Sequence, residues 1–149
     1  MTFITMNASN ALTIEWHLRE CDKRFSPRLS DRVEIGNYAR KLASLADRFE
    51  AWNDSHLVGM VAAYLNNADT RLGFVSNVTV CSEFEGVGLA SELMCKCFQL
   101  ARDKGCRALE LEVGESDQRT QEFYFKHGFK LTGKDRSGFL RMNKDLLGQ

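Results

Sequence analysis

Apolar residues recur at helical spacing in four segments of this chain. Two residues that can cap a helix, Ser9 and Asn10, stand before the first segment. Asp31 with Glu34 forms a capping-box pattern ahead of the second. The predicted helices cover residues 11–21, residues 31–45, Gly88–Lys104 and Asp117–His127.

Strand-like segments joined by polar turns occupy most of the remaining chain. In one of them apolar residues alternate strictly with Glu110 and Glu112, which predicts a strand with one buried face. Short polar connections between the earlier strands predict an antiparallel meander. The expected fold class is therefore α/β (α+β), a mixed, mostly antiparallel sheet flanked by helices. The predicted strands are Thr2–Met6, Arg48–Trp52, Leu57–Leu65, Gly73–Val80, Ala108–Val113, Phe129–Thr132 and Phe139–Met142.

The length and charge of the chain narrow the classes of function. Its 149 residues suit a single domain over residues 1–149, and 44% hydrophobic content is ordinary for a globular protein. Because 20 basic residues balance 20 acidic ones, we expect neither nucleic acid nor an anionic membrane as partner. No apolar run has the length of a membrane span, and residues 1–12 lack a signal-peptide pattern, so we expect a cytoplasmic protein.

The cysteines and histidines show no metal-ligand spacing along the chain. The cysteines are odd in number and form no Cys-x-x-Cys pair, which favours reduced, buried thiols. The histidines are isolated from one another, so no metal is expected. The residues concerned are Cys21, Cys81, Cys95, Cys97 and Cys106, with His17, His56 and His127.

A glycine-containing turn links the strand that ends at Val80 to the third helix. Gly86 and Gly88 carry no Cβ, and the helix that follows begins with unpaired N–H groups at the positive end of its dipole. Such a turn can hold a phosphate, although two glycines also occur in plain tight connections. It is not a P-loop, because Leu89 and Ala90 follow Gly88 where Lys and Ser or Thr would be needed.

A second motif runs from Asp117 to Phe129, with Phe123-Tyr124 at its centre and Gly128 near its end. Taken together, the two motifs resemble the GNAT superfamily of acyl-CoA-dependent N-acetyltransferases. That family's diphosphate signature, Gln/Arg-x-x-Gly-x-Gly/Ala, corresponds here to Glu85-x-x-Gly88-x-Ala90. Its later signature, Asn-x-x-Ala-x-x-Phe-Tyr-x-Lys-x-Gly-Phe, corresponds to residues 117–129. The resemblance is strong in the C-terminal half and rests on the order of elements in the N-terminal half.

The chain departs from the family pattern at four positions. Glu85 stands in place of Gln or Arg, Val87 in place of a basic residue, Asp117 in place of Asn and Thr120 in place of Ala. The first departure has the clearest physical consequence. A carboxylate near a diphosphate costs about 1 kcal/mol in water, so Glu85 is expected to weaken binding unless its side chain points away.

The resemblance implies a site for acetyl-CoA where the strands ending at Val80 and Val113 splay apart in the middle of the sheet. It also implies that the N–H of Val78 binds the thioester oxygen and that Tyr124 is the general acid for the departing thiolate. Tyr124 can alternatively be read as a core aromatic residue. The implied cofactor-binding residues are Val78, Val80, Glu85, Gly86, Val87, Gly88, Leu89, Ala90, Ser91, Asp117, Thr120, Phe123, Tyr124 and Lys126.

The general base is not identified by the motifs, because the strand glutamate of the histone-acetylating branch falls here at Phe74. Three carboxylates are candidates for the base, and Glu112 is ranked before Glu50 and Glu110. For Glu110 and Glu112 the alternative is that they simply lie on a solvated face of their strand. The residues considered for the acceptor pocket are Arg28, Glu50, Trp52, Tyr64 and Asn77, for which packing or a solvated surface is the alternative.

The resemblance implies transfer of acetyl to a primary amine of a small molecule or peptide, by direct attack in a ternary complex. The alternative function is a non-catalytic acyl-CoA-binding or regulatory module, which Glu85 and the missing strand glutamate motivate. Similar proteins commonly dimerise through their last strands, so a homodimer is one state to consider.

Overall fold

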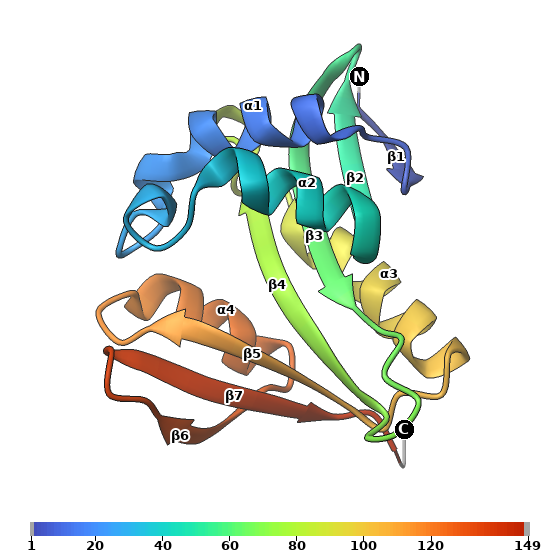
Figure 1. The fold of residues 1–149 in the computed structure, drawn as a ribbon, viewed down its shortest axis with the longest axis vertical. Helices are drawn as coiled ribbons and strands as arrows, with labels where there is room; N and C mark the ends of the chain where they lie inside the picture. Colours follow the sequence, from blue (N-terminus) through green and yellow to red (C-terminus); the bar gives the residue numbers. More distant parts are fainter. Residues whose placement is uncertain (1, 148–149) are drawn as a thin grey trace.

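The computed structural model describes residues 2–147 and contains a seven-stranded sheet with four α-helices (Figure 1). The strand order is β1-β2-β3-β4-β5-β7-β6, and only the β4–β5 pair is parallel. The predicted fold class is thereby confirmed. The strands are β1 (Thr2–Met6), β2 (Asp47–Asn53), β3 (His56–Tyr64), β4 (Leu72–Val80), β5 (Ala108–Gly114), β6 (Lys130–Lys134) and β7 (Phe139–Asp145). The helices are α1 (Ala11–Cys21), α2 (Ile35–Leu45), α3 (Leu89–Asp103) and α4 (Gln118–Lys126), with short 3-10 turns η1 (Asp22–Arg24), η2 (Leu29–Asp31) and η3 (Ser82–Phe84).

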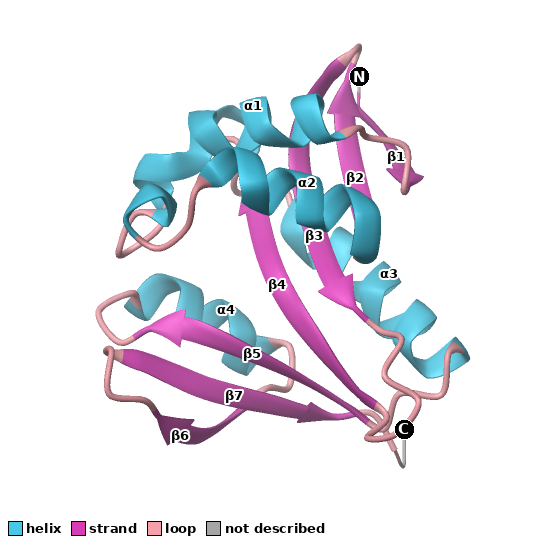
Figure 2. Ribbon diagram, in the orientation of Figure 1, coloured by secondary structure: helices cyan, strands magenta, loops and turns pink. Residues whose placement is uncertain are grey.

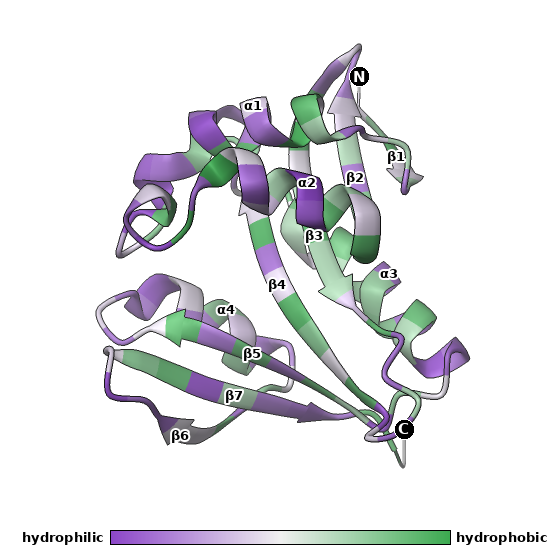
Figure 3. Ribbon diagram, viewed as in Figure 1, coloured by the Kyte–Doolittle hydropathy of each residue, from purple (hydrophilic) through white to green (hydrophobic). Residues whose placement is uncertain are grey.

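Helices cover both faces of the sheet, as Figure 2 shows. On one face α1 and α2 pack over β3 through a cluster that includes Ile14, Leu42 and Met60. On the other face α3 and α4 share a larger cluster, which contains Leu93 and Tyr124. Because β3 is covered on both sides, its residues are apolar almost throughout, whereas the second half of β4 includes the polar residues Ser76, Asn77 and Thr79 (Figure 3).

Two expectations about local structure were wrong. The second helix begins at Ile35 and not after Asp31, because the Glu34 carboxylate caps it by accepting the backbone N–H of Gly36 and Asn37. Asp31 instead ends η2. Cys95 is exposed on the outer face of α3, while the other four cysteines are buried.

The two central strands separate after a short pairing. Residues 72–74 of β4 pair with residues 108–110 of β5, and no further pairs join these strands within residues 2–147. At the paired end a Cβ on Gly73 would lie 2.6 Å from Leu109 Cδ2, so glycine permits the close approach there. At the other end of β5, a Cβ on Gly114 would lie only 2.0 Å from the Ser26 carbonyl oxygen. The sheet therefore opens between β4 and β5, and residues 25–27 lie against the far end of β5.

No helix within residues 2–147 combines the length and apolar composition that crossing a membrane requires.

Candidate active site

A cavity of about 400 Å³ lies where β4 and β5 diverge. This volume is within the range of small-molecule sites. Most of the residues that the motifs indicated line it. These are Asn77, Val78, Val80, Glu85, Gly86, Gly88, Leu89, Ala90, Ser91, Glu112, Asp117, Thr120, Phe123 and Tyr124.

The glycine turn forms one end of this cavity. Gly86 and Gly88 have φ angles of 79° and 80°, in the left-handed region, and a Cβ built on either would meet no atom within 4 Å. The first backbone hydrogen bond of α3 runs from the Glu92 N–H to the Gly88 carbonyl over 3.0 Å. The N–H groups of residues 89–91 precede that bond and have no partner in the helix. Open space beside unpaired N–H groups is what an anion requires at a helix N-terminus.

Glu85 begins this turn, and its carboxylate pairs with two arginines. Arg24 comes from η1, and Arg119 on α4 donates to Glu85 Oε2 over 2.9 Å. The side chain of Arg119 is 82% exposed, so this pair is at the mouth of the cavity. The two guanidinium groups more than neutralise the carboxylate, and the charge of this group of three residues is positive.

The edge of β4 that faces the cavity has unpaired main-chain groups. Cys81 donates its N–H to the Val58 carbonyl of β3 over 2.7 Å. Because N–H groups alternate in direction along a strand, those of Val78 and Val80 point the other way, toward β5 and the cavity. An extended ligand can pair with such an edge.

Tyr124 projects from α4 into the other side of the cavity. Its ring packs edge-on against Phe123 and Phe129, with centroid separations of 5.6 and 5.7 Å. The hydroxyl makes no hydrogen bond with any residue among 2–147. Burial, and then the nearby Asp117 charge, raise the pKa of Tyr124 above its ordinary value of 10.0, so the phenol is protonated at neutral pH.

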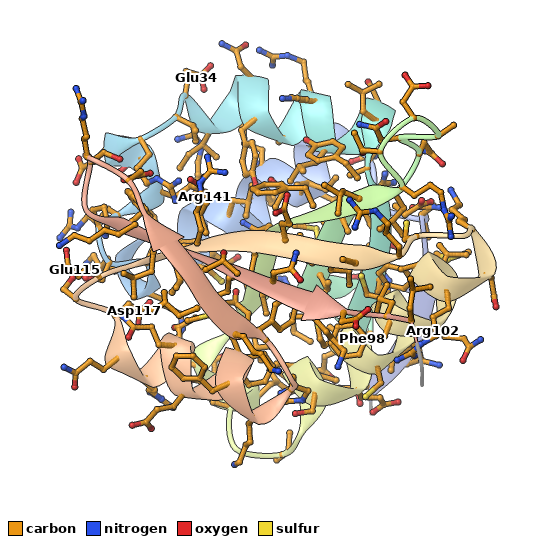
Figure 4. The ribbon with its side chains drawn as sticks, turned by 90° about the horizontal axis from the view of Figure 1, so that it is seen from below. Glu34, Phe98, Arg102, Glu115, Asp117 and Arg141 are labelled. Atoms are coloured by element: carbon orange, nitrogen blue, oxygen red, sulfur yellow. The ribbon has the colours of Figure 1, made fainter. Side chains whose placement is uncertain are left out.

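Glu112 lines the cavity from β5. Its carboxylate lies 4.0 Å from Arg141 Nε on the neighbouring strand β7 and is about a quarter exposed. Asp117, at the start of α4, caps that helix by accepting the Thr120 N–H over 3.3 Å. Figure 4 labels Asp117 and Arg141 and shows the elements from which they project. Glu110, the other carboxylate on this face of β5, lies beside Phe74 where the strands are still paired, outside the cavity lining.

Several residues that the sequence indicated lie outside this lining. Val87 is 73% exposed, Lys126 ends α4 at the surface, and Arg28 is exposed just before η2. Tyr64 lies on β3 with its ring 5.5 Å from the Lys41 ammonium group, and its buried hydroxyl has no partner among the described residues.

Glu50 and Trp52 also lie outside the lining, on β2. The carboxylate of Glu50 is fully buried, pairs with Arg48 Nε at 3.4 Å and accepts the N–H groups of Ala8 and Ser9. Trp52 donates its indole N–H to Thr5 over 2.7 Å. Both residues therefore hold the N-terminal segment to β2. The sequence had instead suggested a place for them in the acceptor pocket.

The cavity also has lining residues that the sequence reasoning missed. They come mainly from the loop between α1 and α2 and from the first residue of β7. No periodic pattern marks that loop, although its single proline and its arginines could have indicated a wall of the cavity. These residues include Arg24, Phe25, Ser26, Pro27, Arg32, Ser76, Phe84, Arg119 and Phe139.

Residues 11–129 match the Acetyltransferase (GNAT) family. The chain belongs to this family. It is 36% identical over 83 residues, 56% of this chain, to Rv2669 of Mycobacterium tuberculosis strain H37Rv, an N-acetyltransferase described as uncharacterised. It is 27% identical over 94 residues, 63% of this chain, to a Bacillus subtilis protein provisionally named a ribosomal protein bS18-alanine N-acetyltransferase. The chain spans 52% and 60% of the length of these relatives.

Among solved structures, the chain is similar to the PaiA N-acetyltransferase of Thermoplasma acidophilum in complex with coenzyme A. The TM-score is 0.75, and the match covers 96% of this chain and 99% of that one. At 17% sequence identity this likeness shows the fold alone.

Proposed function

We propose that this protein is an N-acetyltransferase that moves acetyl from acetyl-CoA to a primary amine of a small molecule or peptide. The observation that carries the proposal is the meeting of three features in one cavity: the open glycine turn, the unpaired edge of β4 and the Tyr124 hydroxyl. The family to which the chain belongs supports the same reaction. The bound donor would place its diphosphate against residues 86–91 and its pantetheine arm along Val78 and Val80.

The chemical step is direct attack of the amine nitrogen on the thioester carbon in a ternary complex. The N–C bond forms, the C–S bond breaks, and negative charge passes through the carbonyl oxygen to the CoA sulfur. The Val78 N–H, which points toward the cavity, is the proposed donor to that oxygen and can contribute a few kcal/mol, on the order of 3.

Tyr124 is the residue proposed to stabilise the departing CoA thiolate. Its raised pKa makes it a weaker acid than an ordinary phenol, which disfavours complete proton transfer but keeps the O–H in place at neutral pH. A hydrogen bond from this hydroxyl to the sulfur is therefore its main contribution. After the attack the nitrogen loses its second proton, the thiolate takes up one proton through the solvent, and the phenol stays protonated throughout.

Glu112 is the proposed base. An alkyl ammonium must lose a proton before its nitrogen can attack, and Glu112 is the partly exposed carboxylate on the β5 wall of the cavity. The proton passes from the ammonium to Glu112, directly or through one water molecule, and then to solvent. Asn77 and the Arg32 side chain line the same region and are proposed to contact the acceptor.

A peptide amine stays among the proposed acceptors because one relative carries the name of an alanine N-acetyltransferase acting on a ribosomal protein. A small amine suits the cavity of about 400 Å³ equally well. We propose no nucleic acid or membrane partner, a cytoplasmic location, one domain over residues 1–149 and no metal in the acetyl-transfer step.

A thiol-release assay tests this function. The protein is mixed with acetyl-CoA and a panel of small amines, amino acids, polyamines and peptides, and free CoA is measured. Turnover on at least one amine, lowered in Glu112→Gln and Tyr124→Phe, is the expected result. Calorimetric CoA binding without turnover on any amine would favour the regulatory module instead, and absence of CoA binding would refute both.

A further inference from the structure

A buried cluster of three ligand-type side chains lies beside the cavity. His17 and Cys21 are one helical turn apart on α1, and Cys81 follows the end of β4. Their exposed fractions are 2%, 1% and 6%, and one ligand atom from each lies within 4.8 Å of the other two. The acetyl-transfer chemistry uses none of them.

The hydrogen bonds around His17 define the direction of its lone pair. Thr79 donates its only hydroxyl proton to Asn77 Oδ1 over 3.0 Å, so it can only accept from His17 Nε2, which lies 2.7 Å away. Nε2 then carries the proton and Nδ1 has the lone pair. That lone pair faces Cys81 Sγ at 3.9 Å and Cys21 Sγ at 4.0 Å. The Leu57 carbonyl oxygen, also an acceptor, lies 3.2 Å from the same nitrogen.

We propose that His17, Cys21 and Cys81 bind one Zn²⁺ ion, with the Leu57 carbonyl as fourth ligand. Two acceptors facing each other at 3.2 Å repel unless a cation or proton lies between them. Tetrahedral zinc places its nitrogen and sulfur ligands about 3.6 Å apart, so the observed separations need to shrink by only about 0.3–0.4 Å. The far nitrogen of a zinc-bound imidazole usually donates a hydrogen bond that fixes the ring, and here Nε2 donates to Thr79 Oγ1.

With zinc bound, the site would have no net charge, which makes its burial inexpensive. On binding, each thiol releases one proton to solvent, and two thiolates balance the two positive charges of Zn²⁺. The remaining ligands are neutral, so no net charge is buried.

Residues next to the cluster offer a path by which the ion could enter, and the bound ion would join three elements of the fold. Glu20 and His56 are exposed and lie 3.3 Å apart, and their ligand atoms lie within 4.8 Å of Cys81 Sγ on the solvent side. An ion that enters there would tie α1 to the ends of β3 and β4. Since β4 is one wall of the cavity, the ion would stabilise the wall that holds the acyl donor. The sequence did not indicate this site, because Cys81 is 64 residues from His17 along the chain.

Zinc titration of the reduced protein, with TCEP present, tests the proposal by calorimetry and native mass spectrometry. One zinc ion per chain is expected, with binding at least about 100-fold weaker in Cys21→Ser and Cys81→Ser. Thr79→Val should weaken it about 10- to 100-fold. Cys95→Ser changes a cysteine that is exposed and outside the cluster, and should bind as the wild type does.

A second measurement keeps the test decisive if a cysteine variant fails to fold. Co²⁺ added to the wild-type protein should produce a thiolate-to-cobalt charge-transfer band in the near ultraviolet. Absence of that band, absence of zinc binding, or equal binding in the folded cysteine variants would overturn the proposal. A Cys21–Cys81 disulfide in place of metal binding would overturn it as well, and mass spectrometry of the alkylated protein detects this outcome.

Discussion

Replacing Glu85 with Gln should tighten CoA binding, although a carboxylate on a diphosphate turn looks at first like a simple defect. The carboxylate holds Arg24 and Arg119, and both guanidinium groups lie at the turn where the diphosphate is proposed to dock. Glu85 therefore competes with the phosphates for two cations. Glutamine keeps the shape of the side chain and removes the charge.

Two terms contribute to the size of the effect. A carboxylate about 5 Å from a phosphate charge repels it by about 0.8 kcal/mol in water, which is a factor of about 4 in Kd. Each exposed arginine–carboxylate pair that must be exchanged for an arginine–phosphate contact adds about 0.2–1 kcal/mol. With two such pairs the total is about 1.2–2.8 kcal/mol, so Glu85→Gln should lower the Kd for CoA about 8- to 100-fold. The gain should shrink as salt is raised, because the pairs are exposed.

Calorimetric titration with CoA at low and high ionic strength measures both effects. Glu83→Gln is the matched control, because Glu83 is an exposed carboxylate two residues away that does not line the cavity. It changes the net charge by the same amount and should leave Kd nearly unaltered. Weaker binding in Glu85→Gln would mean that the carboxylate positions the arginines for the ligand, and the reasoning about competition would be refuted.

Three further predictions concern single side chains. Tyr124→Phe should lower kcat at least tenfold with little change in melting temperature, because the lost hydroxyl has no protein partner among residues 2–147; a normal rate would make the residue structural. Gly114→Ala should cost about 1–3 kcal/mol in chemical unfolding and raise KM, because the new Cβ meets the Ser26 carbonyl, whereas Gly133→Ala meets no atom within 4 Å and should cost less. Burial raises the pKa of Tyr38 from 10.0 to about 12, so the unfolded chain releases this proton first and stability should fall as pH rises from about 10 toward 12. Urea unfolding across that range should show a smaller decline in Tyr38→Phe.

The elements nearest the glycine turn were predictable because their signals are local. The glycine pair and the apolar stripe act within a few residues of each other, and α3 begins at Leu89, one residue after the predicted start at Gly88. Asp117 likewise caps α4. The splay of the sheet was expected from the family resemblance, and the short β4–β5 pairing agrees with it.

Glu50 shows where local patterns fail. A glutamate on a predicted strand reads as a solvent-facing group and so as a candidate base, yet it is fully buried in an ion pair with Arg48. The two residues are two positions apart and share one face of β2, so opposite charges at that spacing were an available signal. The sequence could not predict that the N-terminal segment covers these two residues, because that contact joins positions about forty residues apart.

The proposed acceptor side of the cavity depends on contacts between residues far apart in the sequence. Its wall at residues 25–27 lies against β5 because residue 114 is a glycine, and the two segments are separated by almost ninety residues in sequence. A change in that loop can alter which amine fits without touching the turn, the β4 edge or Tyr124. The proposed acceptor wall and the glycine turn thus come from different segments of the chain, which meet where Arg24 pairs with Glu85. Relatives with the same turn and the same tyrosine therefore need not share a substrate.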